Sequence, residues 1–131
     1  MSSKKRILVV DDNTAILDAL KIMLEDEGYE VETTVDGATV KDIQAPLPDL
    51  VLLDIWMSGV DGRDVCKFLK STPATKHIPV IMISAAKDTE QIAKASGADD
   101  FISKPFQMDV LLKMVAKYVN QPATVTNPLA A

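Results

Sequence analysis

Five residues with chemically useful side chains lie within two positions of the ends of short apolar runs of the sequence. They are Asp11, Asp12, Asp54, Ser84 and Lys104. Three carboxylates brought together would repel one another and raise their own pKa values, and a divalent cation such as Mg²⁺ relieves that conflict. A lysine ammonium and a serine hydroxyl can contact phosphate oxygens, and an aspartate can accept a phosphoryl group. The set therefore predicts a magnesium and phosphoryl site, with Asp54 as its nucleophile.

Five apolar runs at fairly even intervals predict the strands that position these side chains. Continuous β-branched or leucine-rich runs are typical of central strands buried on both faces. The runs are Ile7–Val10, Tyr29–Thr34, Leu50–Leu53, Val80–Ile83 and Phe101–Ile102.

Helical periodicity separates the runs. Three segments carry clear apolar stripes: Ile16, Leu20, Met23 and Leu24; Val65, Phe68 and Leu69; and Leu111, Met114, Val115 and Tyr118. Weaker helices are expected near Gly37–Gln44 and Asp88–Ser96, mainly from their place in the alternation. Five strand–helix units in one chain of 131 residues favour a single α/β domain. We expect a three-layer doubly wound (βα)5 sandwich around a parallel five-stranded sheet, with the site at the carboxyl ends of its strands.

Each site residue also has an ordinary structural interpretation. Asp11 and Asp12 could cap the first helix, since aspartate at a helix N-terminus accepts free amides. Asp54 could be a turn residue, Ser84 a helix cap and Lys104 a solvated surface charge. Only their occurrence together favours the metal and phosphoryl interpretation.

Four segments in order give the chain a family resemblance. They are ILVVDDN (7–13), LVLLDIWMSGVDG (50–62), VIMISA (80–85) and DDFISKPF (99–106). Together they resemble the receiver domain of two-component response regulators, and the resemblance covers residues 5 to about 119. It implies the flavodoxin-like strand order 2-1-3-4-5.

The resemblance also implies roles at the metal site. Asp54 would be the phosphoacceptor and, with Asp12, would bind Mg²⁺ directly, while Asp11 would help through water. The backbone carbonyl of Trp56 would be the third protein ligand. The Trp56 side chain, larger than the polar residues often found there, would lie across the mouth of the site. The family usually has proline where this sequence has Ser58.

Further implied roles concern the phosphoryl group and the switch. Ser84 and Lys104 would contact the phosphoryl group, and the Lys104–Pro105 bond would be cis. Ser84 and Phe101 would move together after phosphorylation. This movement would remodel the face made by the fourth helix, fifth strand and fifth helix, through which a downstream protein would bind. The donor would be a histidine kinase or a phosphotransfer protein.

Composition limits other functions. A net charge of −5 argues against direct nucleic-acid binding, and no apolar run is long enough to span a bilayer, so we expect a cytoplasmic protein without membrane insertion. We expect the receiver domain to occupy residues 1–119. Residues 120–131 are expected to form a flexible tail or the stub of a linker. The chain could be a stand-alone regulator, or a fragment of a larger regulator or hybrid kinase.

Two other function classes are less favoured. A metal-dependent phosphohydrolase would need a carboxylate two residues past the nucleophile, where Trp56 stands. A flavin or nucleotide carrier would need a glycine-rich phosphate loop after the first strand. We therefore expect a phosphoacceptor that assists its own phosphorylation and dephosphorylation, and not an enzyme.

Overall fold

A parallel five-stranded sheet forms the centre of the molecule. The computed structural model describes residues 4–57, 59–85, 87 and 89–120. The sheet has the order β2-β1-β3-β6-β7, and all its pairs are parallel. Its strands are β1 (Arg6–Val10), β2 (Glu30–Thr34), β3 (Leu50–Asp54), β6 (Val80–Ser84) and β7 (Asp100–Ser103). In chain order these are the five expected strands, so the predicted order 2-1-3-4-5 is confirmed.

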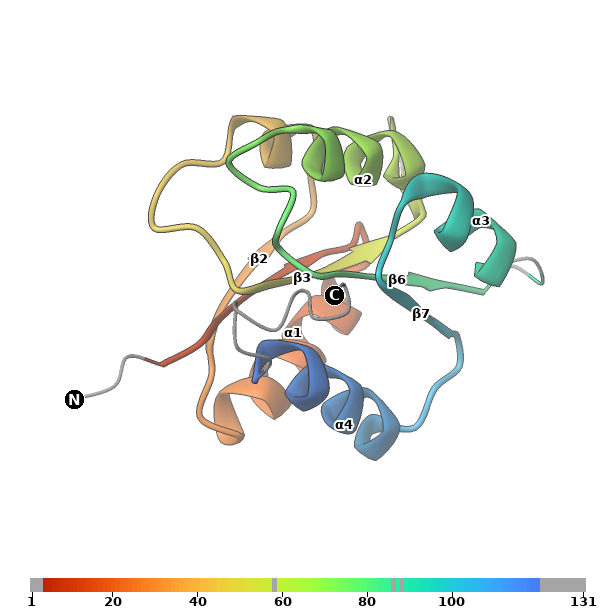
Figure 1. The fold of residues 1–131 in the computed structure, drawn as a ribbon. Helices are drawn as coiled ribbons and strands as arrows, with labels where there is room; N and C mark the ends of the chain where they lie inside the picture. The colour runs from red at the N-terminus through yellow and green to blue at the C-terminus, as the bar shows by residue number, and fades with distance from the viewer. Residues whose placement is uncertain (1–3, 58, 86, 88, 121–131) are drawn as a thin grey trace, which may run out of the picture.

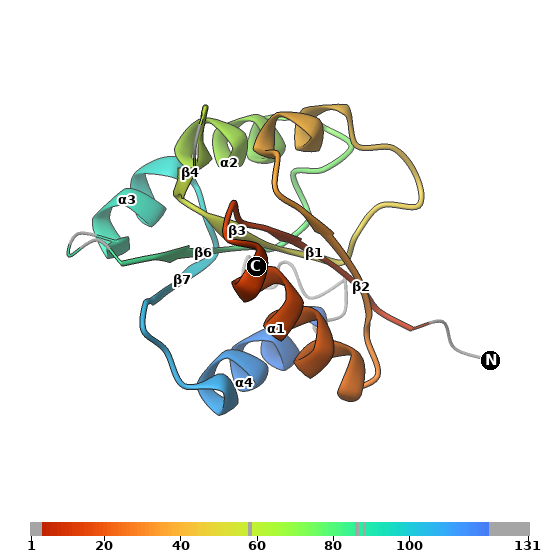
Figure 2. The same cartoon turned by 180° about the vertical axis from the view of Figure 1, so that it is seen from behind.

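Helices cover both faces of the sheet and complete three layers (Figures 1 and 2). Helices α1 (Thr14–Asp26) and α4 (Met108–Val119) lie on one face. The other face carries α2 (Gly62–Ser71), α3 (Thr89–Ser96) and the short 3₁₀ helix η1 (Gly37–Asp42). The expected doubly wound α/β sandwich is therefore the observed fold.

The central strands supply both halves of the core. Alternate residues of a strand point to opposite faces, so each strand contributes to two apolar clusters. In β3, Leu50 and Leu52 pack with α1 and α4, whereas Val51 and Leu53 pack with α2 and α3. Every residue of β3 and β6 is buried, as expected for strands covered on both faces.

Two sequence expectations about the helices need correction. The segment expected as a helix over Gly37–Gln44 is a six-residue 3₁₀ helix that ends at Asp42. Glycine and β-branched residues favour an α-helix weakly, and Pro46 follows closely. In α1, the apolar pattern predicts that Met23 belongs to the buried stripe, but Met23 is exposed. Leu17 is buried instead, because the stripe that faces the sheet consists of Leu17, Leu20 and Leu24.

A small hairpin that the apolar pattern does not predict follows β3. Strand β4 (Trp56–Met57) pairs antiparallel with β5 (Val60–Asp61), and α2 begins at the next residue. The hairpin packs on η1, where a Cβ added at Gly37 would lie 2.9 Å from the end of the Met57 side chain. The chain therefore returns to the layer of α2 immediately after the carboxyl end of β3.

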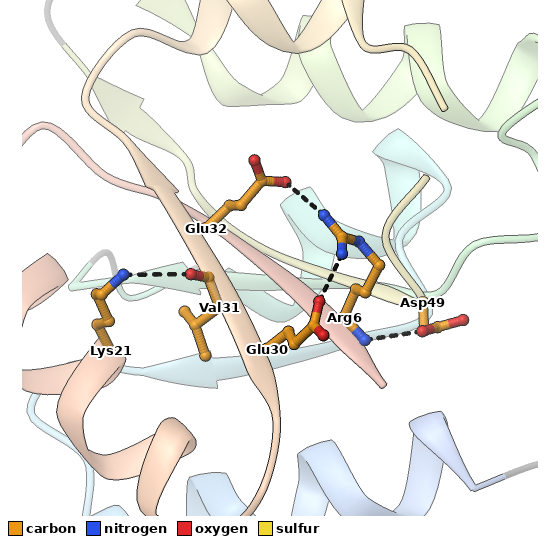
Figure 3. Close-up of polar contacts among 6 residues, drawn as sticks. All are labelled: Arg6, Lys21, Glu30, Val31, Glu32 and Asp49. Atoms are coloured by element: carbon orange, nitrogen blue, oxygen red, sulfur yellow. Dashed lines mark hydrogen bonds and ion pairs between the residues drawn. The ribbon is translucent and has the colours of Figure 1, made fainter. Parts of the chain in front are cut away.

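Strand β2 forms one edge of the sheet and is tied to β1 by charged side chains (Figure 3). The Arg6 guanidinium forms ion pairs with Glu30, its neighbour in register, and with Glu32 two residues further on. The Arg6 backbone N–H donates to the Asp49 carboxylate at 2.8 Å. These contacts fix the register of β1 against β2 and of β1 against the segment that enters β3.

Candidate functional site

Three carboxylates meet at the carboxyl ends of β1 and β3. Asp11 follows β1 and Asp54 ends β3, and these side chains are nearly fully buried; Asp12 is exposed. One carboxylate oxygen from each residue lies within 4.8 Å of the others. The parallel sheet thus brings together the three residues that sequence spacing placed at one edge.

Neither Asp11 nor Asp12 is the cap of helix α1. Asn13 is the cap, because its side-chain oxygen accepts from the backbone N–H groups of Ala15 and Ile16. The Asn13 N–H in turn donates to Asp11 Oδ1 at 2.9 Å, which fixes that carboxylate. The capping interpretation of the aspartate pair is therefore wrong.

Lys104 brings a positive charge to this cluster from the end of β7. Its Nζ lies 3.1 Å from Asp11 Oδ2 and 3.9 Å from Asp54 Oδ1. The Lys104 backbone N–H donates to the carbonyl of Ser84 at 2.8 Å, so β6 and β7 stay in register up to the site. The Lys104–Pro105 bond is cis, as the family resemblance implies.

The environment of Asp54 raises its pKa to about 6. Burial is the largest cause, and the negative charge of Asp11 adds to it; Lys104 and the backbone N–H of Trp56, which donates to the carboxylate, act in the opposite direction. Asp12 raises the pKa further. Burial and the neighbouring negative charges thus outweigh the stabilisation that Lys104 and the Trp56 N–H give to the ionised carboxylate. The donor set is all oxygen and strongly anionic, which fits a hard cation such as Mg²⁺.

Ser84 and Phe101 occupy neighbouring strands on the far side of Asp54 from β1. Ser84 ends β6 and is 1% exposed, and Ile83 beside it is in register with Asp54. Phe101 lies on β7 and is partly buried against the apolar cluster that includes α2 and α3. The sheet therefore places Ser84 on the strand that pairs with β3, and Phe101 on β7, the next strand beyond it.

The hairpin after β3 holds a side-chain group that the sequence patterns did not single out. Arg63 packs over the Trp56 ring, with its guanidinium carbon 4.8 Å from the ring centroid. The same guanidinium contacts the Asp61 carboxylate through Nε at 3.0 Å and Nη2 at 2.6 Å. Aspartate two residues before arginine at the start of a helix was the available signal, but an isolated pair of this kind is common. Trp56, whose side chain is predicted to lie across the mouth of the site, packs its ring against Arg63 and is 49% exposed as a residue.

Gly62 lets this hairpin approach Asp54 closely. A Cβ at Gly62 would lie 2.3 Å from the backbone oxygen of Asp54 and 2.8 Å from the Cα of Ile55. The Gly62 N–H donates to the Ile55 carbonyl at 2.8 Å. Ser58, the expected departure in this loop, lies outside the described residues.

Comparison with known proteins decides the family. Residues 7–116 match the response regulator receiver domain family. The chain belongs to this family. Its members act in two-component signal transduction, so the domain is a signalling receiver.

Individual relatives agree with that assignment. The response regulator PleD of Caulobacter vibrioides is 46% identical over 110 residues, which cover 82% of this chain and 24% of PleD. A putative response regulator from Chloroflexus aurantiacus superposes with a TM-score of 0.83 at 30% identity, covering 91% of this chain and all of that one. The response regulator TrrA from Thermotoga maritima, solved in complex with Mg²⁺ and BeF, has a TM-score of 0.78 at 34% identity and covers 87% of this chain and 98% of TrrA. This chain spans about a quarter of the length of PleD.

Among the described residues, no helix is both long enough and apolar enough to cross a membrane.

Proposed function

We propose that this receiver takes a phosphoryl group on Asp54 from a histidine kinase or a phosphotransfer protein. The observation that carries the proposal is the grouping of Asp11, Asp12 and Asp54 within 4.8 Å, with Lys104 paired to two of them. Carboxylates grouped this closely repel one another, and a hard divalent cation with oxygen ligands relieves that repulsion. The grouping therefore suits a site that binds Mg²⁺ and a phosphoryl group.

The chain's residues divide the work of phosphoryl transfer. An Asp54 carboxylate oxygen attacks phosphorus as the bond from phosphorus to the donor imidazole breaks, and the imidazole keeps the electron pair. Mg²⁺, when bound, neutralises charge on the phosphoryl oxygens. Asp11, Asp12, Asp54 and the Trp56 carbonyl would hold it.

Lys104 and Ser84 would contact the transferred group. The ammonium of Lys104 lies close enough to Asp54 to meet a phosphoryl oxygen there, and the buried Ser84 hydroxyl can donate to another. The added charge favours inward movement of Ser84, and Phe101 would follow into the space this opens.

The output of this movement is a change in protein binding. The remodelled face comprises α3, β7 and α4, which are the fourth helix, fifth strand and fifth helix when η1 is counted as the second. The acidic net charge of −5 favours a protein target over nucleic acid. We propose a receiver over residues 1–119 and a tail or linker over 120–131; residues 1–3 and 121–131 lie outside the described part of the chain. The same site would serve a stand-alone regulator or one module of a longer regulator or hybrid kinase.

Phosphorylation by a small-molecule donor tests the proposal directly. Incubation with acetyl phosphate and Mg²⁺ should add one phosphoryl group, detected by intact-protein mass spectrometry, and EDTA should prevent the addition. Asp54→Asn should abolish it, whereas Asp18→Asn, the same change at an exposed position on α1, should not. Labelling that persists in Asp54→Asn contradicts the assignment of the phosphoacceptor.

A further inference from the structure

Trp56, Arg63 and Asp61 form one connected group, which we call the hairpin clamp. The Arg63 guanidinium packs on the Trp56 ring and is gripped at its edge by both oxygens of Asp61. The Asp61 carboxylate is itself fixed, because its Oδ1 accepts the Arg63 backbone N–H at the start of α2. Planar stacking together with bidentate pairing is a geometry that arginine provides and lysine does not.

The hairpin clamp acts on a residue that already contacts the phosphoacceptor. The Trp56 backbone N–H donates to the Asp54 carboxylate. Trp56 and Asp61 face each other in the β4–β5 pair, and Gly62 between Asp61 and Arg63 packs directly on the Asp54 backbone. Two backbone pairs alone connect β4 to β5, so the side-chain contacts add a substantial share of the restraint on this short hairpin.

We propose that Arg63 is a positioning residue that holds Trp56 in place beside Asp54, so that the Trp56 backbone meets Mg²⁺ and lies next to the phosphoryl group in a fixed geometry. The inference rests on the proposed function for its phosphoryl consequence, while its effect on Mg²⁺ does not require phosphorylation. Arg63 itself touches neither the metal nor the phosphoryl group in this mechanism; it acts through Trp56.

Positioning and simple charge predict opposite effects on Mg²⁺ binding. Removing a positive charge near three carboxylates makes the site more negative, so electrostatics alone would tighten binding of a cation. Loss of the hairpin clamp instead releases Trp56 and disorders one proposed ligand, which weakens binding. The sign of the change therefore separates the two explanations.

The test uses Mg²⁺ alone and the full chain. Arg63→Met keeps an unbranched side chain over the ring but removes the charge and the planar guanidinium. We therefore expect the Mg²⁺ dissociation constant, measured by calorimetry, to rise about tenfold, the lower end of the loss that follows when the support of a metal ligand is removed. Trp56 is the single tryptophan, and its fluorescence should become more accessible to acrylamide quenching as Arg63 leaves one face of the ring. Lys67→Met, which removes an exposed positive charge one turn further along α2, should leave both measurements near those of the wild type.

Two results would overturn the proposal. One is Mg²⁺ binding in Arg63→Met that equals or exceeds that of the wild type; the other is weaker binding with unchanged quenching, because the effect would then bypass Trp56. Should Arg63→Met fail to fold, Arg63→Lys keeps a cation near the ring and should show the same changes in smaller degree. In the Trp56→Leu background, Arg63→Met should have little further effect on Mg²⁺ affinity.

The lifetime of the phosphoryl group on Asp54 is a second measurement, and it separates this inference from the proposed function. If the wild-type chain takes no phosphoryl group at all, the proposed function fails, while the Mg²⁺ and quenching results still decide the role of Arg63. If the wild type is phosphorylated, loss of phosphate from Arg63→Met should differ from the wild type at least twofold, and Lys67→Met should not. Equal lifetimes in Arg63→Met and the wild type would contradict control of the phosphoryl group by the hairpin clamp.

Discussion

Lys104 pairs with Asp11, and not chiefly with the proposed phosphoacceptor. Its Nζ lies 3.1 Å from Asp11 Oδ2 but 3.9 Å from Asp54 Oδ1. Because Asp11 is 1% exposed and the Lys104 side chain 23%, this contact is screened by water and salt less than a surface ion pair is. In the unphosphorylated protein the ammonium therefore occupies the same negative field that a divalent cation would enter.

Lys104→Met should raise Mg²⁺ affinity and lower phosphorylation. The substitution removes a positive charge that competes for Asp11 and Asp54, so the cation should bind about three- to tenfold more tightly. It also removes the ammonium proposed to meet the phosphoryl group, so labelling by acetyl phosphate should slow. Calorimetry and intact mass measure the two effects on the same samples. Weaker Mg²⁺ binding in Lys104→Met would show that the ammonium does not compete with the cation. Lys87→Met, which removes the same charge at an exposed position, is the control.

Asp12→Ala should weaken Mg²⁺ binding more than Asp11→Ala does. Each change has two opposing effects on Mg²⁺ binding, because it removes a metal contact but also relieves repulsion among the carboxylates. The lost contact matters more at Asp12, the proposed direct ligand, than at Asp11, which would act through water. Titration of Trp56 fluorescence with Mg²⁺ should report the difference, since its carbonyl is the other proposed ligand. An Asp12→Ala protein that binds Mg²⁺ as the wild type does would refute the ligand role.

Asp54→Asn should stabilise the metal-free protein at neutral pH. The folded-state pKa of about 6 lies above the ordinary value of 3.8, so folding binds a proton and ionised Asp54 opposes folding. This penalty is absent below about pH 4, grows between pH 4 and 6, and is complete above pH 6. From the free-energy equivalent of a pKa shift, we expect Asp54→Asn to gain roughly 2 to 3 kcal/mol at pH 7.5 and about 1 kcal/mol near pH 4.5. Urea unfolding in EDTA at several pH values measures this. A gain of equal size at both pH values, or the same gain in Asp18→Asn, would mean that the charge of Asp54 is not its cause.

Phosphorylated Asp54 should lose its phosphate slowly. Hydrolysis needs a water in line with the bond from oxygen to phosphorus, and a hydrogen-bonding side chain at the rim to orient it. The residues two positions past Asp54 and two positions past Ser84, which we expect to flank the approaching water, are Trp56 and Ala86. An indole can donate a hydrogen bond but cannot accept one, and the alanine side chain can do neither. Ala86 lies outside the described residues. We expect Trp56→Asn combined with Ala86→Glu to shorten the lifetime of the phosphorylated protein clearly. Mass spectrometry after removal of acetyl phosphate measures this lifetime. Decay at equal rates in both proteins would rule out a role for these side chains in excluding water.

The fold could be predicted because apolar runs and helical stripes alternate, and the site because parallel strands end at one edge. The 3₁₀ form of η1 could not be predicted, since a weak helical segment next to prolines admits more than one backbone solution. The exposed Met23 was missed because a stripe boundary on α1 depends on the angle at which the helix meets the sheet.

The hairpin clamp was missed for a different reason. Its members are ordinary polar and aromatic residues whose meeting depends on a two-residue antiparallel pair, and such short pairs leave no periodic pattern. The alternative interpretation of Asp11 and Asp12 as helix caps could not be decided from sequence either, since Asn13 competes for the same amides and only the backbone geometry decides between them.

The paired charges at the edge strand β2 have a consequence for association. An open sheet edge offers free backbone groups to any extended chain, and exposed charged residues discourage such pairing. On β2, Glu30 and Glu32 are exposed and Arg6 lies across them, so an added strand would have to displace ion pairs and bring its own side chains against acidic groups. This edge is thereby protected against strand addition and amyloid-like stacking at high protein concentration.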